Sequence, residues 1–257
     1  MQGVPISDSI SRLEQVAALG WPAPDTRAMG GWLLRAADGW TGRANSVLPL
    51  GSPDRPLDAA LTAVRQWYAE RGLPARFQIP LPLRSDLDAE LDRRGWEAYN
   101  PTLVRVARID EVRAVARDRR LPAAIFDSTP SEAWLGAYHY RGGSHLPPVA
   151  VRVMTAAADP VFASVTVDGV LAGIGRAVVD YDTDGQGWCG ITALETVPEF
   201  RRMGIGQHLV VALLTWAFGR GASQVYLQVM EDNVAAHAMY DRLGFTTSHS
   251  YHYRKSA

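Results

Sequence analysis

The sequence contains very little cysteine and lysine. Cys189 is its single cysteine, which excludes an internal disulfide and a zinc site built on several thiolates. The six histidines are scattered, and no carboxylate or cysteine joins His249 and His252 at a ligand-like spacing, so we expect no metal centre. Lys255 is the single lysine, so arginine carries almost all of the positive charge.

The sequence also lacks a surplus of charge of either sign. Its 26 basic and 27 acidic residues give a net charge of −1, whereas a protein that mainly neutralises nucleic-acid phosphates carries a basic surplus. Residues 1–20 show no basic start followed by an apolar run, and the longest apolar run, 209–218, is about half of a membrane span. We therefore expect a cytoplasmic protein without a nucleic-acid or membrane partner.

The residues that are present are typical of a globular α/β protein. Hydrophobic residues make up 47% and charged residues 21%, and 257 residues suit one large domain or two small ones. The C-terminal part shows the clearest pattern, with a hairpin turn expected at Asp168-Gly169. The predicted strands there are Val161–Val167, Val170–Val179, Trp188–Val197, Val225–Met230 and Phe245–Tyr253, and the predicted helices are Ser131–Tyr140, Gln207–Phe218 and Asn233–Leu243.

The N-terminal half repeats this order of elements. Its predicted strands are Gly31–Ala37, Arg43–Leu50, Arg76–Ile79 and Pro101–Val106, and its predicted helices are Leu57–Ala69 and Ser85–Arg94, the latter with Ser85 as N-cap. A helical stretch is also expected within Asp110–Arg119.

The two halves match at a constant offset of 149 residues. The identities and near-identities fall at the ends of helices: Trp67 with Trp216, Arg71-Gly72 with Arg220-Gly221, Asp92-Arg93 with Asp241-Arg242, and Gly95-Trp96 with Gly244-Phe245. The need for a glycine after each helix would explain the glycine pairs but not the others. We therefore predict an internal duplication, with domains at 1–109 and 131–257 joined by a connection at 110–130.

The turn at Arg201–Gly206 carries the strongest chemical signal. It links a strand that ends at Pro198 to an apolar helix, and its glycines, Gly204 and Gly206, allow close backbone approach to a ligand. The unpaired N–H groups and partial positive charge of the helix start add an anion site suited to a pyrophosphate. An ordinary flexible helix start is the alternative that the turn alone leaves open.

The surrounding residues resemble the GNAT superfamily of N-acetyltransferases over residues 130–257. The superfamily's coenzyme A signature is matched by Arg201, Gly204 and Gly206, and a second motif by Asn233, Ala236 and Tyr240, followed by Leu243-Gly244-Phe245. The resemblance implies an α/β (α+β) fold with two GNAT-like domains, each a mixed, mostly antiparallel sheet flanked by helices.

The resemblance also implies where acetyl-CoA binds. The backbone of Arg201, Arg202, Met203, Gly204, Ile205, Gly206 and Gln207 would hold the pyrophosphate. The strand Leu194–Val197 would splay from Val225–Met230, so that the pantetheine arm pairs near Thr196 and Val197 and a backbone N–H around Leu194–Thr196 polarises the thioester. Asn233 and Ala236 would lie beside the pantetheine.

The N-terminal copy departs from this pattern. Ser52-Pro53-Asp54-Arg55-Pro56-Leu57 stands opposite the turn, Arg84 opposite Asn233 and Leu91 opposite Tyr240. Two prolines remove N–H donors and an aspartate would repel a pyrophosphate. We expect this half to have kept the fold and lost the cofactor.

Two residues are candidates for proton transfer. Tyr240 would protonate the departing thiolate, with core packing as the alternative. Glu195 would take the proton of the amine directly or through water, with a solvent-facing strand residue as the alternative; Glu231 and Asp232 are weaker candidates. Cys189 has no paired base nearby in sequence, so we do not expect a covalent relay.

The acceptor side is less defined. Two groups of residues could form this side. The first could be an aromatic wall for the acceptor or pack in the core, and consists of Trp134, Tyr138, His139, Tyr140 and Arg141. The second could attract a cationic amine or belong to a solvated turn, and consists of the loop carboxylates Asp180, Asp182 and Asp184. The first hypothesis is an N-acetyltransferase that moves the acetyl group of acetyl-CoA to a small-molecule or peptide primary amine by direct transfer in a ternary complex. The alternatives are a non-catalytic acyl-CoA sensor and an acyltransferase with a longer acyl donor; a homodimer is left open.

Overall fold

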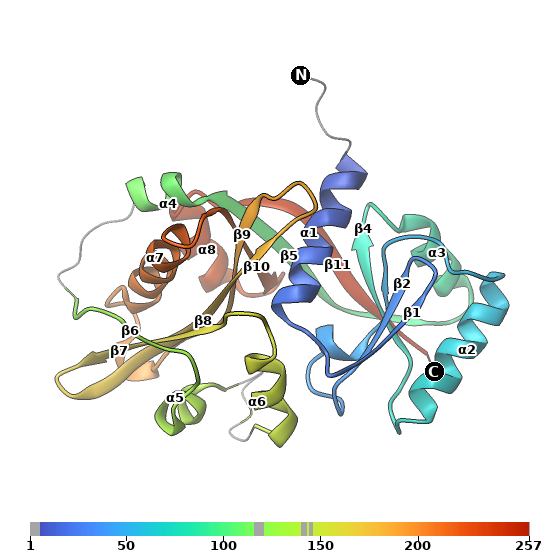
Figure 1. The fold of residues 1–257 in the computed structure, drawn as a ribbon, viewed down its shortest axis with the longest axis horizontal. Helices are drawn as coiled ribbons and strands as arrows, with labels where there is room; N and C mark the ends of the chain where they lie inside the picture. Colours follow the sequence, from blue (N-terminus) through green and yellow to red (C-terminus); the bar gives the residue numbers. More distant parts are fainter. Residues whose placement is uncertain (1–5, 116–120, 140–142, 144–145, 257) are drawn as a thin grey trace. The chain divides into compact units, whose positions relative to one another are not determined.

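The computed structural model describes residues 6–115, 121–139, 143 and 146–256 (Figure 1). These residues form two compact units. Unit 1 comprises Met1–Val104, Met230–Asp232 and Thr247–Ala257, and unit 2 comprises Arg105–Val229 and Asn233–Thr246. The units therefore interleave along the chain, and strands β5 (Glu97–Arg108) and β11 (Thr246–Lys255) contribute residues to both. The sequence domains 1–109 and 131–257 stay a prediction about repeats along the chain.

Unit 2 is built on a sheet in the order β10-β9-β8-β7-β6, whose bounds are β6 Ile125–Asp127, β7 Val161–Val167, β8 Val170–Tyr181, β9 Gly187–Thr196 and β10 Ala222–Met230. The pairs β6·β7, β7·β8 and β8·β9 are antiparallel, and β9·β10 is parallel. Asp168 and Gly169 join β7 to β8 with φ of 51° and 81°, as a type I′ hairpin turn requires. This mixed, mostly antiparallel sheet confirms the predicted fold class.

The helices of unit 2 lie on both faces of this sheet. Helix α7 (Ile205–Phe218) packs against β7, β8 and β9, and a Cβ placed on Gly173 of β8 would lie 2.6 Å from Ile205 Cγ2. On the other face Arg176 of β8 donates through Nε to the Met154 carbonyl of α6, 2.8 Å away. The remaining helices are α4 (Ile109–Val115), α5 (Glu132–Ala137), α6 (Pro148–Thr155) and α8 (Val234–Arg242).

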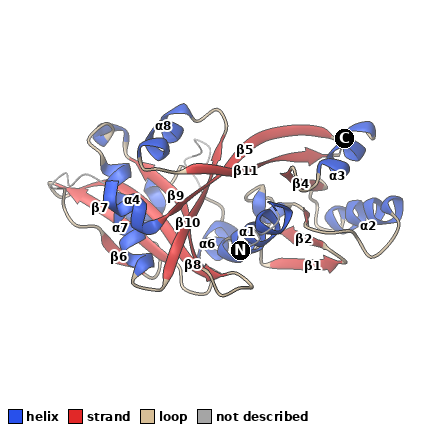
Figure 2. Ribbon diagram, turned by 90° about the horizontal axis from the view of Figure 1, so that it is seen from above, coloured by secondary structure: helices blue, strands red, loops and turns tan. Residues whose placement is uncertain are grey.

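Unit 1 contains a small antiparallel sheet, β1-β2-β3, and a second group of strands in the order β4-β11-β5 (Figure 2). The bounds are β1 Asp25–Met29, β2 Trp32–Ala36, β3 Leu48–Pro49 and β4 Arg76–Leu81, with helices α1 Ile6–Gly20, α2 Leu57–Ala69 and α3 Ser85–Arg93. Val47 bridges Phe77 in parallel and so connects the two groups of strands. A large apolar core that includes Trp32, Phe77 and Trp96 fills the unit.

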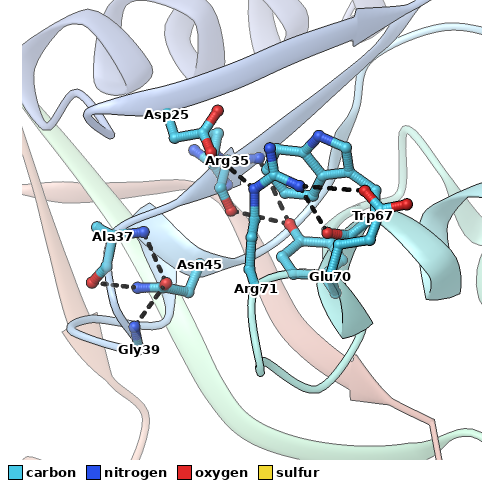
Figure 3. A network of polar contacts seen from close by, with 9 residues as sticks. Asp25, Arg35, Ala37, Gly39, Asn45, Trp67, Glu70 and Arg71 are labelled. Atoms are coloured by element: carbon cyan, nitrogen blue, oxygen red, sulfur yellow. Dashed lines mark hydrogen bonds and ion pairs between the residues drawn. The ribbon is translucent and has the colours of Figure 1, made fainter.

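A polar network fixes the ends of elements in unit 1 (Figure 3). The Arg71 guanidinium stacks over the Trp67 ring at 3.7 Å, donates to the Trp67 carbonyl and pairs with Asp25. The Asn45 side-chain oxygen accepts the N–H groups of Ala37 and Gly39 and so fixes the loop after β2.

Several element bounds repeat at the predicted offset of 149 residues. Helix α3 starts at Ser85 and α8 at Val234, while β5 starts at Glu97 and β11 at Thr246. Arg220 lies over the Trp216 ring at 4.1 Å, as Arg71 lies over Trp67. These matching contacts involve side chains as well as glycines, and they support the duplication.

Several local predictions differ from the structure. Arg43–Leu50 is not one strand, because Arg43–Asn45 forms a 3-10 turn and Leu48–Pro49 alone is extended. Ser85 is not the N-cap of α3, since its hydroxyl donates to the Pro82 carbonyl and Arg84 occupies the cap position. Helices α1 and α6 and strands β1 and β6 were not predicted from the sequence. Among the described residues, no helix has the length and apolarity that a membrane crossing needs.

Candidate active site

The glycine-containing turn leads into the start of α7 as predicted. Arg202 and Gly204 both have positive φ, 69° and 89°, with Gly204 at the N-cap position of the helix. No side chain in the described part of the chain caps this helix start, so its first N–H groups are available to a ligand. Left-handed residues before an uncapped helix start are a backbone geometry that can bind an anion, so this turn is a candidate anion site.

Gly206 shows how closely three elements approach this turn. A Cβ placed on Gly206 would lie 3.3 Å from Met239 Sδ of α8 and 3.4 Å from Thr196 Oγ1 of β9. A side chain here would enter the space between β9, α7 and α8. The absence of a side chain at Gly206 therefore lets β9, α7 and α8 approach one another closely at the turn.

Strand β9 separates from β10 just before this turn. The parallel ladder runs from Ala222↔Gly187 to Leu227↔Ile191, although β9 continues to Thr196 and β10 to Met230. On its other side, β9 has one residue more than β8 between the pairs Ile174↔Glu195 and Arg176↔Thr192, and Ala193 has φ of 51°. Such a bulge leaves a backbone group out of the ladder and bends the strand. The strand edge near Leu194–Thr196 is the expected place for an extended ligand.

The end of β9 presents successive side chains to opposite faces. Thr196 lies beside Gly206 of α7, and a Cβ on Gly175 would lie 3.2 Å from Leu194 Cδ1 on the same face. Glu195 stands between these two residues, so its side chain points to the face covered by α5 and α6. The turn and Glu195 are therefore reached from opposite sides of one strand end.

The Glu195 carboxylate is held by His139, which follows α5. The backbone N–H of His139 donates to Oε2 at 2.8 Å, and its Nδ1 lies 2.9 Å from Oε1. Both residues are candidates in the sequence, but their contact was not predicted, because 56 residues separate them along the chain.

Asn233 and Tyr240 are positioned by α8. The Asn233 side chain accepts the Ala236 N–H at 3.1 Å and caps the helix. Tyr240 is buried, with its ring against Phe245, and burial raises the pKa of its phenol well above the ordinary value while Arg105 lowers it by a smaller amount. The phenol therefore stays protonated at neutral pH, as a proton donor requires.

A family model described as the C-terminal region of the probable histone acetyltransferase Rv0428c matches residues 7–254. The probable histone acetyltransferase Rv0428c of Mycobacterium tuberculosis is 33% identical over 249 residues, which cover 95% of this chain and 73% of that protein. The chain belongs to this family. It is a GNAT acyltransferase, and GNAT enzymes draw their acyl group from an acyl-CoA.

Further relatives carry the same relationship. The N-acetyltransferase YobR of Bacillus subtilis, whose own role is uncharacterised, is 28% identical over 96% of this chain and 98% of its own length. A GCN5-related N-acetyltransferase from Kribbella flavida shares the fold with a TM-score of 0.69 at 16% identity, over 100% of this chain and 96% of that one. A tandem GNAT protein from the clavulanic acid biosynthesis pathway aligns with a TM-score of 0.60 at 15% identity, over 95% of this chain and 87% of that one. Its architecture supports the tandem GNAT reading.

In the N-terminal half, the segment that corresponds to the turn is packed against another part of the chain. A Cβ on Gly30 would lie 2.5 Å from the Asp54 nitrogen, so the chain packs directly onto the segment opposite Arg201–Gly206. Arg84, which stands opposite Asn233, donates to the carbonyls of Pro49 and Gly51. Gly30 thus packs on this segment, and Arg84 binds the residues just before it.

The residues predicted to line the acceptor side differ in part from that prediction. Trp134 is a core residue, 2% exposed, whose indole donates to the Ala163 carbonyl and packs on Phe162. Asp182 accepts hydrogen bonds from the Trp188 indole and from backbone N–H groups of its own loop. These contacts favour the alternative in which this loop is a turn. Tyr140 and Arg141 lie outside the described residues.

The sequence reading missed a buried arginine on this face. Arg176 is fully buried on β8, and its Nη1 donates to Thr192 Oγ1 of β9 at 3.2 Å. An arginine in the middle of the apolar run 170–179 was the available signal. The described residues hold no group of three or more metal-ligating side chains.

Proposed function

We propose that this GNAT enzyme moves the acetyl group of acetyl-CoA to a primary amine, by direct transfer within a ternary complex. The observation that carries the proposal is the uncapped turn before α7, beside the strand edge where β9 leaves β10. We assign the binding of the pyrophosphate to the turn residues, Arg201 to Gln207. In this proposal the pantetheine arm is bound by the strand residues Leu194, Thr196 and Val197, together with Asn233 and Ala236.

The chemistry needs a neutral amine, a stabilised oxyanion and a proton for the thiolate. In this proposal the backbone around Leu194–Thr196 polarises the thioester carbonyl and Tyr240 protonates the leaving thiolate. Glu195 supplies the negative charge that draws a proton from the acceptor ammonium. Its place on the opposite face of β9 from the turn lets cofactor and acceptor approach from two sides.

The acceptor is a small-molecule or peptide amine. A carboxylate at Glu195 suits a cationic ammonium group, and the name of the Mycobacterium tuberculosis relative, a probable histone acetyltransferase, adds lysine-rich peptides to the candidates.

Two measurements test the proposal. Acetyl-CoA at about 100 times its Kd should stabilise the protein by ~2.7 kcal/mol, seen as a higher melting temperature. A panel of small amines and a lysine-rich histone-tail peptide, incubated with acetyl-CoA, should then release free thiol with at least one acceptor.

The acyl donor is compared in the same assay. Hexanoyl-CoA in place of acetyl-CoA distinguishes an enzyme for longer acyl groups. An unchanged melting temperature at millimolar acetyl-CoA, or faster turnover with hexanoyl-CoA, would contradict the proposal.

A further inference from the structure

His139 and Glu195 form a two-point contact beside the proposed acetyl-transfer site. The Glu195 carboxylate accepts from the His139 backbone N–H through one oxygen, at 2.8 Å, and faces the ring Nδ1 through the other, at 2.9 Å. Two contacts fix both the carboxylate plane and the imidazole. Such a fixed imidazole beside a carboxylate is the arrangement used when histidine acts as a proton acceptor.

The contact selects one tautomer of the ring. An ionised carboxylate only accepts hydrogen bonds, so the proton shared with Oε1 belongs to Nδ1. A neutral imidazole protonated at Nδ1 carries its lone pair on Nε2. The ring nitrogen farther from Glu195 is therefore the one able to take up a proton.

Exposure separates the roles of the two side chains. The Glu195 side chain is 24% exposed and the His139 side chain 43% exposed. Both Glu195 oxygens are already engaged by His139, whereas the ring of His139 extends further into solvent. An arriving ammonium group therefore reaches the imidazole more readily than the carboxylate.

We propose that His139 is the catalytic base of the transfer, accepting the acceptor's proton on Nε2, and that Glu195 is a positioning residue that orients the ring. This inference rests on the proposed acetyl transfer to a primary amine and specifies the proton's route.

The step balances as follows. The ammonium R-NH₃⁺ gives one proton to Nε2 and becomes a neutral amine, whose nitrogen forms a bond to the thioester carbonyl carbon. The C–S bond breaks and Tyr240 protonates the leaving thiolate. The nitrogen loses its second proton as the amide forms, and that proton restores the Tyr240 phenol. The imidazolium then releases its proton to solvent. The carboxylate of Glu195 keeps its charge throughout.

The test compares kcat/KM against pH for wild type, His139→Gln and Glu195→Gln, with the amine that gives the fastest thiol release. His139→Gln should lower kcat/KM at neutral pH by at least 100-fold. The loss should shrink as pH approaches the pKa of the free amine, because the amine then arrives neutral. The acetyl-CoA melting shift should stay unchanged. Added imidazole should restore part of the activity of His139→Ala.

A second histidine–carboxylate pair provides the control. His252 Nε2 lies 2.7 Å from Asp88 Oδ1 in unit 1, and neither residue has a role in the proposed chemistry, so His252→Gln should leave kcat/KM and its pH profile unchanged. Independently of activity, nitrogen NMR of the imidazole should show His139 protonated at Nδ1, and Glu195→Gln should alter that signal.

The outcomes separate the two proposals. Wild type that transfers acetyl groups while His139→Gln matches it at every pH overturns the role of His139 alone. If Glu195→Gln loses all activity while His139→Gln keeps the wild-type kcat/KM, the catalytic base is Glu195 and not His139. Wild type that releases no thiol with any amine overturns the acetyl-transfer proposal, and the role of His139 with it.

Discussion

Arg254 of β11 reaches Asp92 of α3, with Nη1 2.6 Å from Oδ1, across 162 positions of the chain. The same guanidinium donates to the Trp96 carbonyl. At the offset of 149 residues, Arg105 of β5 makes the same two contacts, to Asp241 and to the Phe245 carbonyl. The final strand of each sequence half therefore carries the arginine that binds the other half's helix.

Removing the Arg254 side chain should destabilise the protein. Arg254→Ala removes the donor to the Trp96 carbonyl and leaves Asp88 with His252 as its partner, and we expect a loss of about 2–3 kcal/mol in the free energy of unfolding, measured with urea. Asp92→Asn removes only the exposed partner and should have a much smaller effect. Equal unfolding midpoints for Arg254→Ala and wild type would contradict the structural role of this contact.

Gly206 should be essential for cofactor binding rather than for helix formation. Gly206→Val places a side chain between Thr196 and Met239, so acetyl-CoA affinity should fall at least tenfold, as measured by calorimetric titration. Gly219→Ala is the matched control at the other end of α7, where a Cβ meets nothing closer than 3.5 Å. Full affinity in Gly206→Val would remove this glycine from the binding site.

Tyr240 should affect turnover more than binding. Its buried phenol has a pKa raised by desolvation, so it remains a proton donor through the neutral range. Tyr240→Phe should lower kcat about 10–100-fold with little change in the acetyl-CoA melting shift. Tyr181→Phe, which removes an exposed hydroxyl bonded to the Arg220 carbonyl, is the control. A Tyr240→Phe enzyme with normal kcat would leave only the packing role.

Asp180 should make stability depend on pH. Partial burial raises the pKa of its carboxyl from 3.8 to about 6, against a lowering by Arg176. Because the folded pKa lies above the unfolded one, the folded protein binds the extra proton and loses stability as pH rises from about 4 to 6. Asp180→Asn removes this cost.

The expected gain of Asp180→Asn is about 1 kcal/mol at pH 7.5, less than the linkage limit because the side chain is partly exposed. The gain should disappear below about pH 4, where the carboxyl is neutral in both states. Urea unfolding at the two pH values measures it, and a gain that is the same at both would refute the assignment to ionisation.

Cys189 should be chemically silent in the folded enzyme. It is fully buried on β9, and burial raises the pKa of its thiol. An aromatic disulfide reagent should therefore react slowly with the native protein. After unfolding, the same reagent should titrate one thiol per chain. Cys189→Ala should retain acetyl transfer, as direct attack on the thioester requires. Loss of activity in a folded Cys189→Ala protein would favour a covalent intermediate.

Local sequence patterns determined much of this protein. The Asp168-Gly169 turn, the helices that end before glycine and the two GNAT motifs act over a few residues, so they predicted most of the elements of unit 2, the turn before α7 and the offset of 149 residues. Prediction failed where local pattern was weak: α6 lies in a short proline-led stretch, and the apolar residues of 43–50 resemble a strand that Asn45 instead holds as a turn.

Only the tertiary structure decided which side chains meet. His139 and Glu195 are 56 residues apart, and Arg105 and Asp241 are 136 apart. Trp134 lies in the core, where strand β7 accepts its indole N–H through the Ala163 carbonyl and packs against its ring through Phe162. Hydrophobic periodicity fixes which face of an element is buried, but not which element covers it. The proposed acid and cofactor turn could therefore be named from the sequence, while the partner of Glu195 could not.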